Sequence, residues 1–300
     1  MMLREDLNVT QLGLISIQRK IADDYTSWKV AFERAGIESE VECNGAQKYG
    51  VPHGIDNDSY LALQELYIEQ GCAEDGRVAF TMYRLLQLCG LEDSCANRRM
   101  MRESLERLSA TQYWISGAWR SHENDDWVTV GFRLIEKLAF TRSRRDSGGA
   151  QAIAVSLPAE LTRNIRNGYF KPVSTTLMRQ LGQPARAAYR VIDSLRHDPV
   201  QHHLKTGTLQ LPLMDLAQRC GIAAARQDPA DPGADSHHAA GVWVPARRAD
   251  HRAWEGPDRE LHLWLDGAGT QRRAGGAADG AESAAGGCQE GRARLPGKGP

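Results

Sequence analysis

The chain has 300 residues and a net charge of −1, so its length allows one large domain or two smaller ones and its overall charge points to no particular partner. The charge is unevenly spread, because residues 1–97 carry 8 Lys and Arg against 16 Asp and Glu, residues 98–226 carry 20 against 11, and residues 227–300 carry 9 against 11. A basic middle section favours a nucleic-acid partner, although an ordinary solvated surface also explains it.

Cysteine usage and hydropathy argue against two further classes. None of the cysteines forms a C-x-x-C pair, so a zinc ribbon or a redox motif has no support. No apolar run approaches the roughly 18 residues of a membrane span, and no signal peptide is recognisable. We therefore expect a reduced, cytoplasmic protein without a membrane partner.

Residues 1–58 predict a β-rich segment that packs on the unit behind it. The stretch LGLISIQ (12–18) alternates, and TSWKVAFERAGIESEVEC (26–43) predicts two strands around Ala35-Gly36. YGVPHGIDND (49–58) is typical of a loop, and Asp58 or Ser59 would cap the helix that follows.

Residues 59–140 predict a winged helix-turn-helix unit. Met101, Leu105 and Leu108 share one face of its third helix, because they are spaced by four and then three residues. The expected elements are a helix at 59–71, a strand at 78–80, a helix at 82–90 capped by Thr81, a helix at 97–109, and a β-hairpin of 112–120 and 127–135 joined by the tip SHENDD (121–126). Helix, strand, helix, helix, hairpin is the order of a winged helix-turn-helix domain.

Residues 141–150, which begin TRSRRDSGG, predict a basic linker, and residues 151–226 predict a second unit. Its expected elements are a strand at 151–158, a short helix at 159–167, a helix at 183–198 with Ala185, Ala188, Ile192 and Leu195 on one face, a strand at 207–211 and a helix at 212–221.

An internal repeat links the two units. MYRLLQLCGL (82–91) and LMDLAQRCGI (213–222) share Leu, Gln, Cys and Gly at a constant offset of 131 residues. Each segment is predicted to follow a short strand, which itself follows an amphipathic helix. We therefore predict an α+β fold of tandem winged helix-turn-helix units, the second of which is incomplete.

Residues 227–300 predict a disordered, low-complexity C-terminal tail. These 74 residues contain no Ile, Met, Phe, Tyr or Asn, but 15 Ala and 13 Gly, so they offer little apolar surface to bury. A natural low-complexity tail explains this composition, and a shifted reading frame is the second hypothesis. Codons permitted for HHAAGVWVP (237–245), read one base later, spell Thr-Thr-Leu-Leu-Glu-Ser-Gly-Tyr-Leu. In that case the second unit lacks its recognition helix and wing, and Leu213, Leu216, Ala217 and Ile222 lose packing partners.

Several blocks of the sequence, in order, resemble replication initiator protein A, a family of winged-helix initiators of bacterial plasmids and secondary replicons. The blocks lie within about residues 7–225 and are LNVTQLGLISIQ, YGVPHGIDND, RESLERLSATQYWISGAWR, WVTVGFRLIEKLAFTR and GYFKPVSTTLMRQLGQPARAAYRVIDSLRHDP. The resemblance implies binding to origin repeats in double-stranded DNA, opening of the duplex nearby, and recruitment of the host initiator and the replicative helicase. It also allows one unit to serve in dimerisation, which would make the chain a homodimer.

The DNA-contacting residues are expected first on the third helix, whose early residues enter the major groove in a helix-turn-helix protein. These are Asn97, Arg98, Arg99 and Arg102, and Arg and Asn side chains recognise guanine and adenine through paired hydrogen bonds. The alternative is that these arginines pair with Glu103 and Glu106 on an ordinary helix surface. Further candidates for phosphate contacts, which could equally be solvated, are Arg142, Arg144, Arg145, Arg163, Arg166 and Lys171.

Two observations restrict the functional alternatives. The tip of the predicted wing, residues 121–126, carries three acids and no Lys or Arg, which is the wrong sign for holding phosphates. His202 and His203 are adjacent, with no residue between them, so they do not match the metal-binding pair of a DNA-nicking initiator. We expect no enzyme activity, no metal and no cofactor. A winged-helix transcription repressor and an inactive truncated initiator remain as alternatives.

Overall fold

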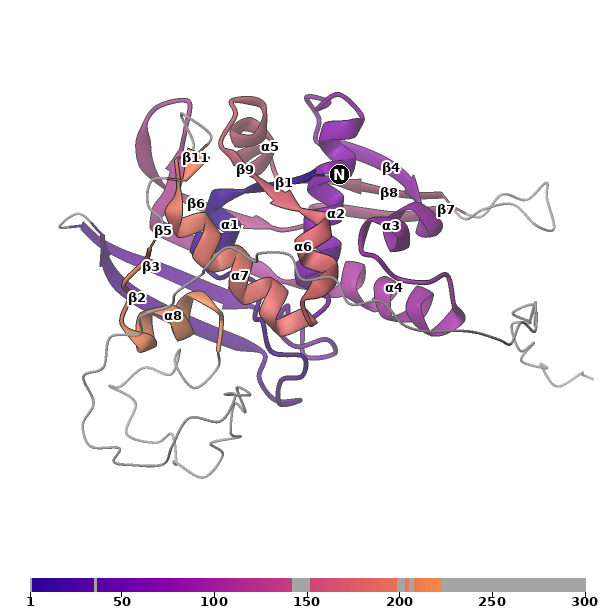
Figure 1. Cartoon of the computed structure of the whole chain (residues 1–300), viewed down its shortest axis with the longest axis horizontal. Helices are drawn as coiled ribbons and strands as arrows, with labels where there is room; N and C mark the ends of the chain where they lie inside the picture. Colours follow the sequence, from indigo (N-terminus) through magenta and orange to yellow (C-terminus); the bar gives the residue numbers. More distant parts are fainter. Residues whose placement is uncertain (1, 35–36, 142–151, 199–202, 205–207, 223–300) are drawn as a thin grey trace, which may run out of the picture. The chain divides into compact units, whose positions relative to one another are not determined.

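The computed structural model describes residues 2–34, 37–141, 152–198, 203–204 and 208–222 (Figure 1). The elements up to residue 110 are β1 (Met2–Asp6), α1 (Leu7–Gln11), β2 (Ser27–Arg34), β3 (Ile37–Asn44), α2 (Asp56–Glu69), β4 (Arg77–Thr81), α3 (Met82–Leu88) and α4 (Cys95–Ala110). They are followed by β5 (Gln112–Ser121), β6 (Asp126–Arg133), β7 (Lys137–Thr141), β8 (Ala152–Ser156), α5 (Ala159–Arg166), β9 (Phe170–Ser174), α6 (Thr175–Gln180), α7 (Gln183–Arg196), β10 (His197–Asp198), β11 (His203–Leu204) and α8 (Leu213–Arg219). No helix within these ranges has the length and hydropathy to cross a bilayer.

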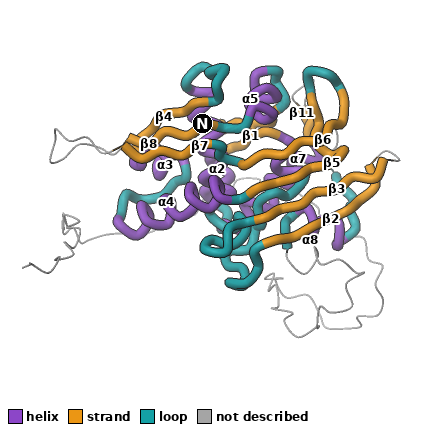
Figure 2. Tube along the Cα trace, turned by 180° about the vertical axis from the view of Figure 1, so that it is seen from behind, coloured by secondary structure: helices purple, strands orange, loops and turns teal. Residues whose placement is uncertain are grey.

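Two antiparallel sheets contain most of the strands, so the fold mixes helices and sheets as predicted. The larger has the strand order β2-β3-β5-β6, and the smaller has the order β4-β8-β7 (Figure 2). β1 pairs with β9, so the N-terminal strand lies beside residues 170–174. The predicted tail, residues 227–300, lies outside the described residues.

Several local predictions are confirmed. The two strands expected within residues 26–43 are β2 and β3, and the strand expected at 78–80 is β4. The Thr81 hydroxyl accepts a hydrogen bond from the Arg84 backbone N–H at 3.2 Å and so caps α3 as predicted. Helix α2 begins three residues earlier than expected, at Asp56, whose carboxylate accepts a hydrogen bond from the His53 backbone N–H at 2.9 Å.

Residues 12–18, whose alternation placed them in the predicted β-rich segment, form no strand, and a turn after α1 takes their place. Gly13 has a φ of +61°, a left-handed conformation that interrupts a strand. A Cβ added to Gly13 would lie 2.1 Å from the Arg219 carbonyl oxygen, so the turn also lets α8 approach closely. Alternating apolar residues therefore mark a buried turn here, in which Leu12, Leu14 and Ile15 all face the core.

The hairpin predicted as the wing belongs to a different sheet from β4. Strands β5 and β6 extend the sheet of β2 and β3, whereas β4 pairs with β8, and β8 pairs with β7. β8 lies at the start of the predicted second unit, yet it pairs with β4 and β7 of the predicted first unit. The correct partner of β4 could not be read from the sequence, since a strand's alternation shows its buried face but not its neighbour.

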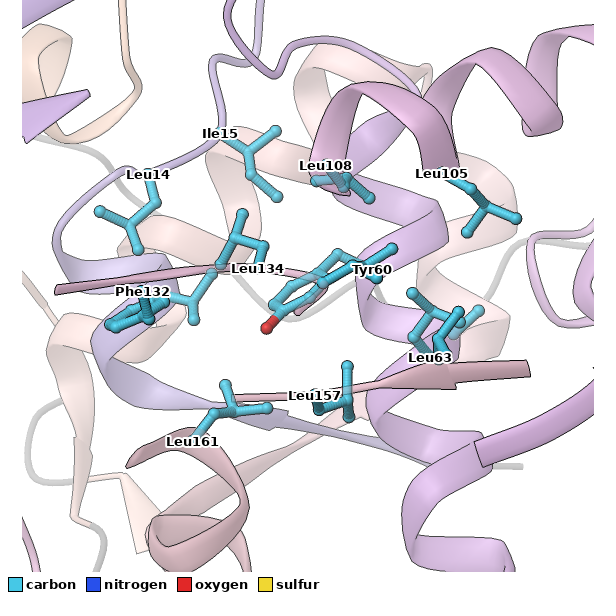
Figure 3. Packing of buried hydrophobic residues seen from close by; sticks show 14 of the residues in the cluster. Leu14, Ile15, Tyr60, Leu63, Leu105, Leu108, Phe132, Leu134, Leu157 and Leu161 are labelled. Carbon is cyan, nitrogen blue, oxygen red and sulfur yellow. The ribbon is translucent and has the colours of Figure 1, made fainter. Parts of the chain in front are cut away.

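The larger of two hydrophobic clusters in the described residues joins α2, α3, α4 and α5 to both sheets. Figure 3 shows Tyr60 of α2 between Leu105 and Leu108 of α4 on one side and Leu157 and Leu161 on the other. These five side chains are between 0% and 3% exposed. The predicted apolar face of α4 is confirmed, because Met101 is also fully buried.

The internal repeat of the sequence is matched by a structural repeat. α3 and α8 both have seven residues, and both end in a glycine with a left-handed backbone, Gly90 at φ +69° and Gly221 at φ +67°. The same hydrogen bonds close the two ends, since Leu91 N–H donates to the Leu86 carbonyl at 2.9 Å and Ile222 N–H donates to the Ala217 carbonyl at 3.0 Å. This arrangement is a Schellman motif.

The predicted apolar face of α7 is wrong. Ala185 is exposed and Ala188, Ile192 and Leu195 are half-buried, whereas the buried positions are Ala187, Arg190, Val191, Asp193, Ser194 and Arg196. The helix is turned in this direction because Arg190 forms an ion pair with Glu5 of β1. The Ser194 carbonyl also accepts a hydrogen bond from the Gln11 side chain at 2.9 Å.

Asp6 predicts a pH dependence of stability. Its side chain is fully buried at the junction of β1 and α1, and burial raises the pKa of this carboxyl from 3.8 to about 7. The folded protein therefore holds this proton more tightly than the unfolded chain does. The contribution of Asp6 to stability is fully present below pH 4 and is lost as the pH rises through about 7.

We expect Asp6→Asn to raise the free energy of unfolding at pH 8, by up to about 4 kcal/mol, and to change it little at pH 4. An asparagine oxygen still accepts the capping hydrogen bond from the Val9 backbone N–H, which is 3.2 Å long. Urea unfolding at the two pH values measures the difference. An equal effect of the substitution at both pH values would contradict the assignment.

Candidate nucleic-acid interface

Helix α4 carries four of the predicted DNA-contacting residues in its first two turns, where Arg98 and Arg99 are exposed and Asn97 and Arg102 are half-buried. Ser94 caps the helix, since its hydroxyl accepts a hydrogen bond from the Asn97 backbone N–H at 3.2 Å. Two hydrogen-bonded pairs fix the helix on α2, namely Ser59–Ser104, with 2.6 Å between the hydroxyl oxygens, and Arg107–Asp56, with nitrogen–oxygen distances of 2.6 and 3.0 Å. The helix is therefore held rigidly while its first two turns remain accessible.

Asn97 and Arg98 are partly occupied by local partners. The Asn97 side-chain amide donates to the Glu92 carbonyl at 2.8 Å, and the Arg98 guanidinium binds the Asp93 carboxylate, with an Nη2–Oδ2 distance of 2.7 Å. The hydrogen bond to Arg98 lowers the pKa of Asp93. Since both ion-pair partners are partly exposed, this pair stabilises little and can be exchanged for a phosphate or a base.

Arg99 and Arg102 occupy different surroundings. Arg99 is exposed, and the described part of the chain offers it no salt bridge. The Arg102 guanidinium lies 4.2 Å from the centre of the Phe140 ring on β7, a cation–π contact that joins α4 to this strand. The alternative in the sequence analysis was that the arginines of α4 pair with Glu103 and Glu106. Arg98 instead pairs with Asp93. The Glu106 carboxylate accepts a hydrogen bond from the Tyr49 hydroxyl at 3.0 Å.

The contact between Arg102 and Phe140 places α4 beside the end of β7. One residue after Phe140, Thr141 pairs with Ala152 of β8, so residues 142–151 connect two paired strands. Arg142, Arg144 and Arg145 lie outside the described residues, but the strands that flank them end next to α4. The sequence signal for this hairpin was the alternation within KLAFT (137–141) and AIAVS (152–156), which were assigned to different units.

Arg163 and Arg166 lie on α5, apart from the predicted DNA-contacting residues of α4. Both views place α5 at the top of the molecule and α4 lower down, beneath α3 at the end where β7 and β8 lie (Figure 1, Figure 2). The Arg163 guanidinium lies 3.5 Å from the Glu123 carboxylate in the acidic tip of the β5–β6 hairpin, and the Asn164 side chain accepts a hydrogen bond from the His122 backbone N–H. The acidic tip therefore packs against α5, and the two arginines do not belong to the surface of α4.

The prediction that Lys171 contacts phosphates is corrected by its burial. Its side chain is fully buried, and its ammonium lies 3.0 Å from the Asp193 carboxylate and 3.6 Å from that of Glu5. A lysine that neutralises two buried carboxylates cannot reach a DNA backbone. The sequence did not reveal this role, because both acids are distant in the sequence and Lys171 stands in a strand of otherwise ordinary pattern.

Comparison with known proteins matches residues 4–232 to the family model of replication initiator protein A. Among solved structures, the chain is similar to domains 2 and 3 of RctB, crystallised as selenomethionine derivatives, with a TM-score of 0.50 and 14% identity over 71% of this chain and 76% of that chain. A second crystal structure of RctB domains 2–3 gives a TM-score of 0.44 and 15% identity over 71% of this chain and 75% of that chain. At this identity the first likeness shows the fold alone. No curated protein matches the sequence.

Proposed function

The chain belongs to the replication initiator protein A family, and on that premise we propose that it binds double-stranded DNA at origin repeats through a winged-helix module. The module consists of α2, β4, α3 and α4, with β7 and β8 as its wing. The strand order β4-β8-β7 is the observation that carries the proposal. It places a hairpin beside the strand that separates the first two helices, which is where the wing of such a module lies.

This choice of wing removes the difficulty of the acidic tip. The β5–β6 hairpin, whose tip is acidic, belongs to the other sheet, and the connection of the β7–β8 hairpin contains Arg142, Arg144 and Arg145. Cationic side chains at a wing provide the salt-dependent contacts to phosphates that hold a protein on DNA. The proposed wing therefore carries the positive charge that binding to DNA phosphates requires.

Sequence reading is assigned to the first two turns of α4. An α-helix fits the major groove, where arginine recognises guanine and asparagine recognises adenine by paired hydrogen bonds. In the proposed complex, the exposed Arg99 can contact a base directly. Arg98 must first break its ion pair with Asp93, and Asn97 its hydrogen bond to the Glu92 carbonyl. The family further suggests that the bound initiator recruits the host initiator and the replicative helicase. These steps are binding steps, and the proposal contains no catalytic step.

Footprinting of the full 300-residue chain on its parent replicon tests the proposal. We expect protection of an array of direct repeats, with an affinity that falls steeply as the salt concentration rises. Protection of one palindrome upstream of a gene would instead identify a transcription repressor. The absence of protection at low salt would overturn DNA binding itself.

A further inference from the structure

A cavity of about 380 Å³ lies where the two units predicted from the sequence meet. Helices α2 and α3 line it from the first unit, and α6 and α7 line it from the second. Its volume falls within the range of roughly 300–1,000 Å³ that is usual for small-molecule sites, which often occur at the boundary between units. None of the described residues of α4, β7 or β8 lines it. The cavity is therefore separate from the proposed DNA interface.

Three arginines from three different helices line this cavity, namely Arg84 of α3, Arg179 of α6 and Arg186 of α7. Among the described lining residues they face one carboxylate, that of Asp58. The Arg190 guanidinium also lies 3.9 Å from the Asp58 carboxylate and so shares its negative charge. The cavity therefore has an excess of positive charge.

The ion pairs of these arginines leave part of their hydrogen-bonding capacity for another acceptor. Arg84 binds the Glu69 carboxylate through Nη2, at 2.7 and 3.0 Å, and Arg186 binds the Asp58 carboxylate through its own Nη2. A guanidinium has five N–H donors, so each can bind a further acceptor as well. Arg179 is exposed, and the described ranges offer it no salt bridge.

The Nε–H group of Arg186 indicates most directly that a partner is missing. Its nitrogen is buried, and it has no hydrogen-bond partner among the described residues. Buried polar groups in proteins nearly always have a partner, and an unsatisfied buried donor is costly. Because Arg186 lines the cavity, an acceptor bound there can satisfy this donor.

Another part of the cavity wall is apolar. Leu3 of β1, Leu61 of α2 and Met178 of α6 line it. They are between 3% and 8% exposed and belong to the smaller of the two hydrophobic clusters. A ligand that fills the cavity therefore needs an anionic group for the arginines and a less polar part for these side chains.

We propose that this cavity binds a small phosphorylated molecule. A carboxylate is matched by a single arginine, whereas a phosphate offers three oxygens and up to two negative charges to several guanidinium groups. The less polar part of the ligand lies against Leu3, Leu61 and Met178. The bound molecule connects the two units, because the arginines that hold it come from both. This inference goes beyond the proposed function and does not rest on it.

Isothermal titration calorimetry of the full 300-residue chain tests the proposal with adenosine monophosphate, inorganic phosphate and adenosine at constant ionic strength. We expect adenosine monophosphate to bind at one site per chain, inorganic phosphate to bind more weakly, and adenosine not to bind detectably. Absence of binding by both phosphate-bearing probes would overturn the proposal, and so would adenosine that binds as tightly as its monophosphate. Inorganic phosphate that binds at least as tightly as adenosine monophosphate would indicate a site for an ion only, and would also overturn it.

Two arginine variants locate the bound probe. Arg179→Ala is expected to raise the Kd for adenosine monophosphate by about 10-fold to 150-fold, because it removes hydrogen bonds to a charged group. The matched control, Arg77→Ala, removes an exposed arginine of β4 that does not line the cavity, and should leave this Kd unchanged. Equal effects of the two substitutions would show that net charge governs binding, and would overturn the site.

Footprinting of the same variants separates the cavity from a contact with DNA. We expect the Arg179→Ala variant to protect the origin repeats as well as the unchanged chain does. If it protects them less well and neither phosphate-bearing probe binds, Arg179 contacts the DNA backbone and the proposal is overturned. A chain that binds adenosine monophosphate but gives no footprint would overturn only the proposed function.

Discussion

Replacing Glu5 by alanine is expected to lower the free energy of unfolding by about 3–5 kcal/mol. The Glu5 carboxylate is fully buried, forms an ion pair with the Arg190 guanidinium, and lies 3.6 Å from the Lys171 ammonium. Burial alone would raise the pKa of Glu5, but the charges of Arg190 and Lys171 outweigh it and hold the pKa below its usual value. Without Glu5, two buried cations share the remaining carboxylates of Asp193 and Asp58.

Urea unfolding of the variant measures this loss. The matched control is Glu40→Ala, which removes the partner of Lys29 from an exposed ion pair with a nitrogen–oxygen distance of 2.8 Å. The control should cost no more than about 1 kcal/mol. Equal effects of the two substitutions would show that the buried network does not hold β1, β9 and α7 together.

The second large effect is expected in DNA binding. Arg99→Ala should weaken binding to the origin repeat by about 1–3 kcal/mol, which is roughly 5-fold to 150-fold in Kd, and should relax specificity. Arg99 is exposed and belongs to the cationic side of α4, so the substitution should leave the free energy of unfolding unchanged within about 0.5 kcal/mol. Titration of the repeat and of a random duplex of the same length, at one salt concentration, gives both quantities.

Arg77→Ala is the matched control for this prediction. It removes the same charge from an exposed position on β4, but Arg77 pairs with Ser156, at the end of the sheet opposite the β7–β8 connection. We expect it to change the affinity for both duplexes little. If Arg77→Ala and Arg99→Ala weaken binding equally, net charge rather than α4 determines binding.

Much of the candidate site could be predicted from the sequence, because its determinants are local. The spacing of Met101, Leu105 and Leu108 fixes which side of α4 is buried, and hence which side carries the arginines. Thr81 and Gly90 define the beginning and the end of α3 through hydrogen bonds between close neighbours. The repeat at residues 213–222 was visible for the same reason, since a helix cap depends on a few adjacent residues.

The roles of Lys171 and of α7 could not be predicted in this way. Arg190 and Glu5 are 185 residues apart, yet their ion pair turns α7 so that its more apolar side is left partly uncovered. Lys171 is indistinguishable in the sequence from a solvated lysine, and only the approach of Glu5 and Asp193 makes its burial tolerable.

By itself the sequence determined where many of the helices and strands form, though not β1, α1, β7, β9 or α6. It also determined which side of α4 is cationic and that α8 repeats α3. Only the tertiary structure decided which hairpin stands beside β4 and which lysine is buried. The physical reason is that caps and helical faces arise from neighbours along the chain. Strand pairing and buried ion pairs instead join residues that the chain keeps far apart, and local pattern does not specify their partners.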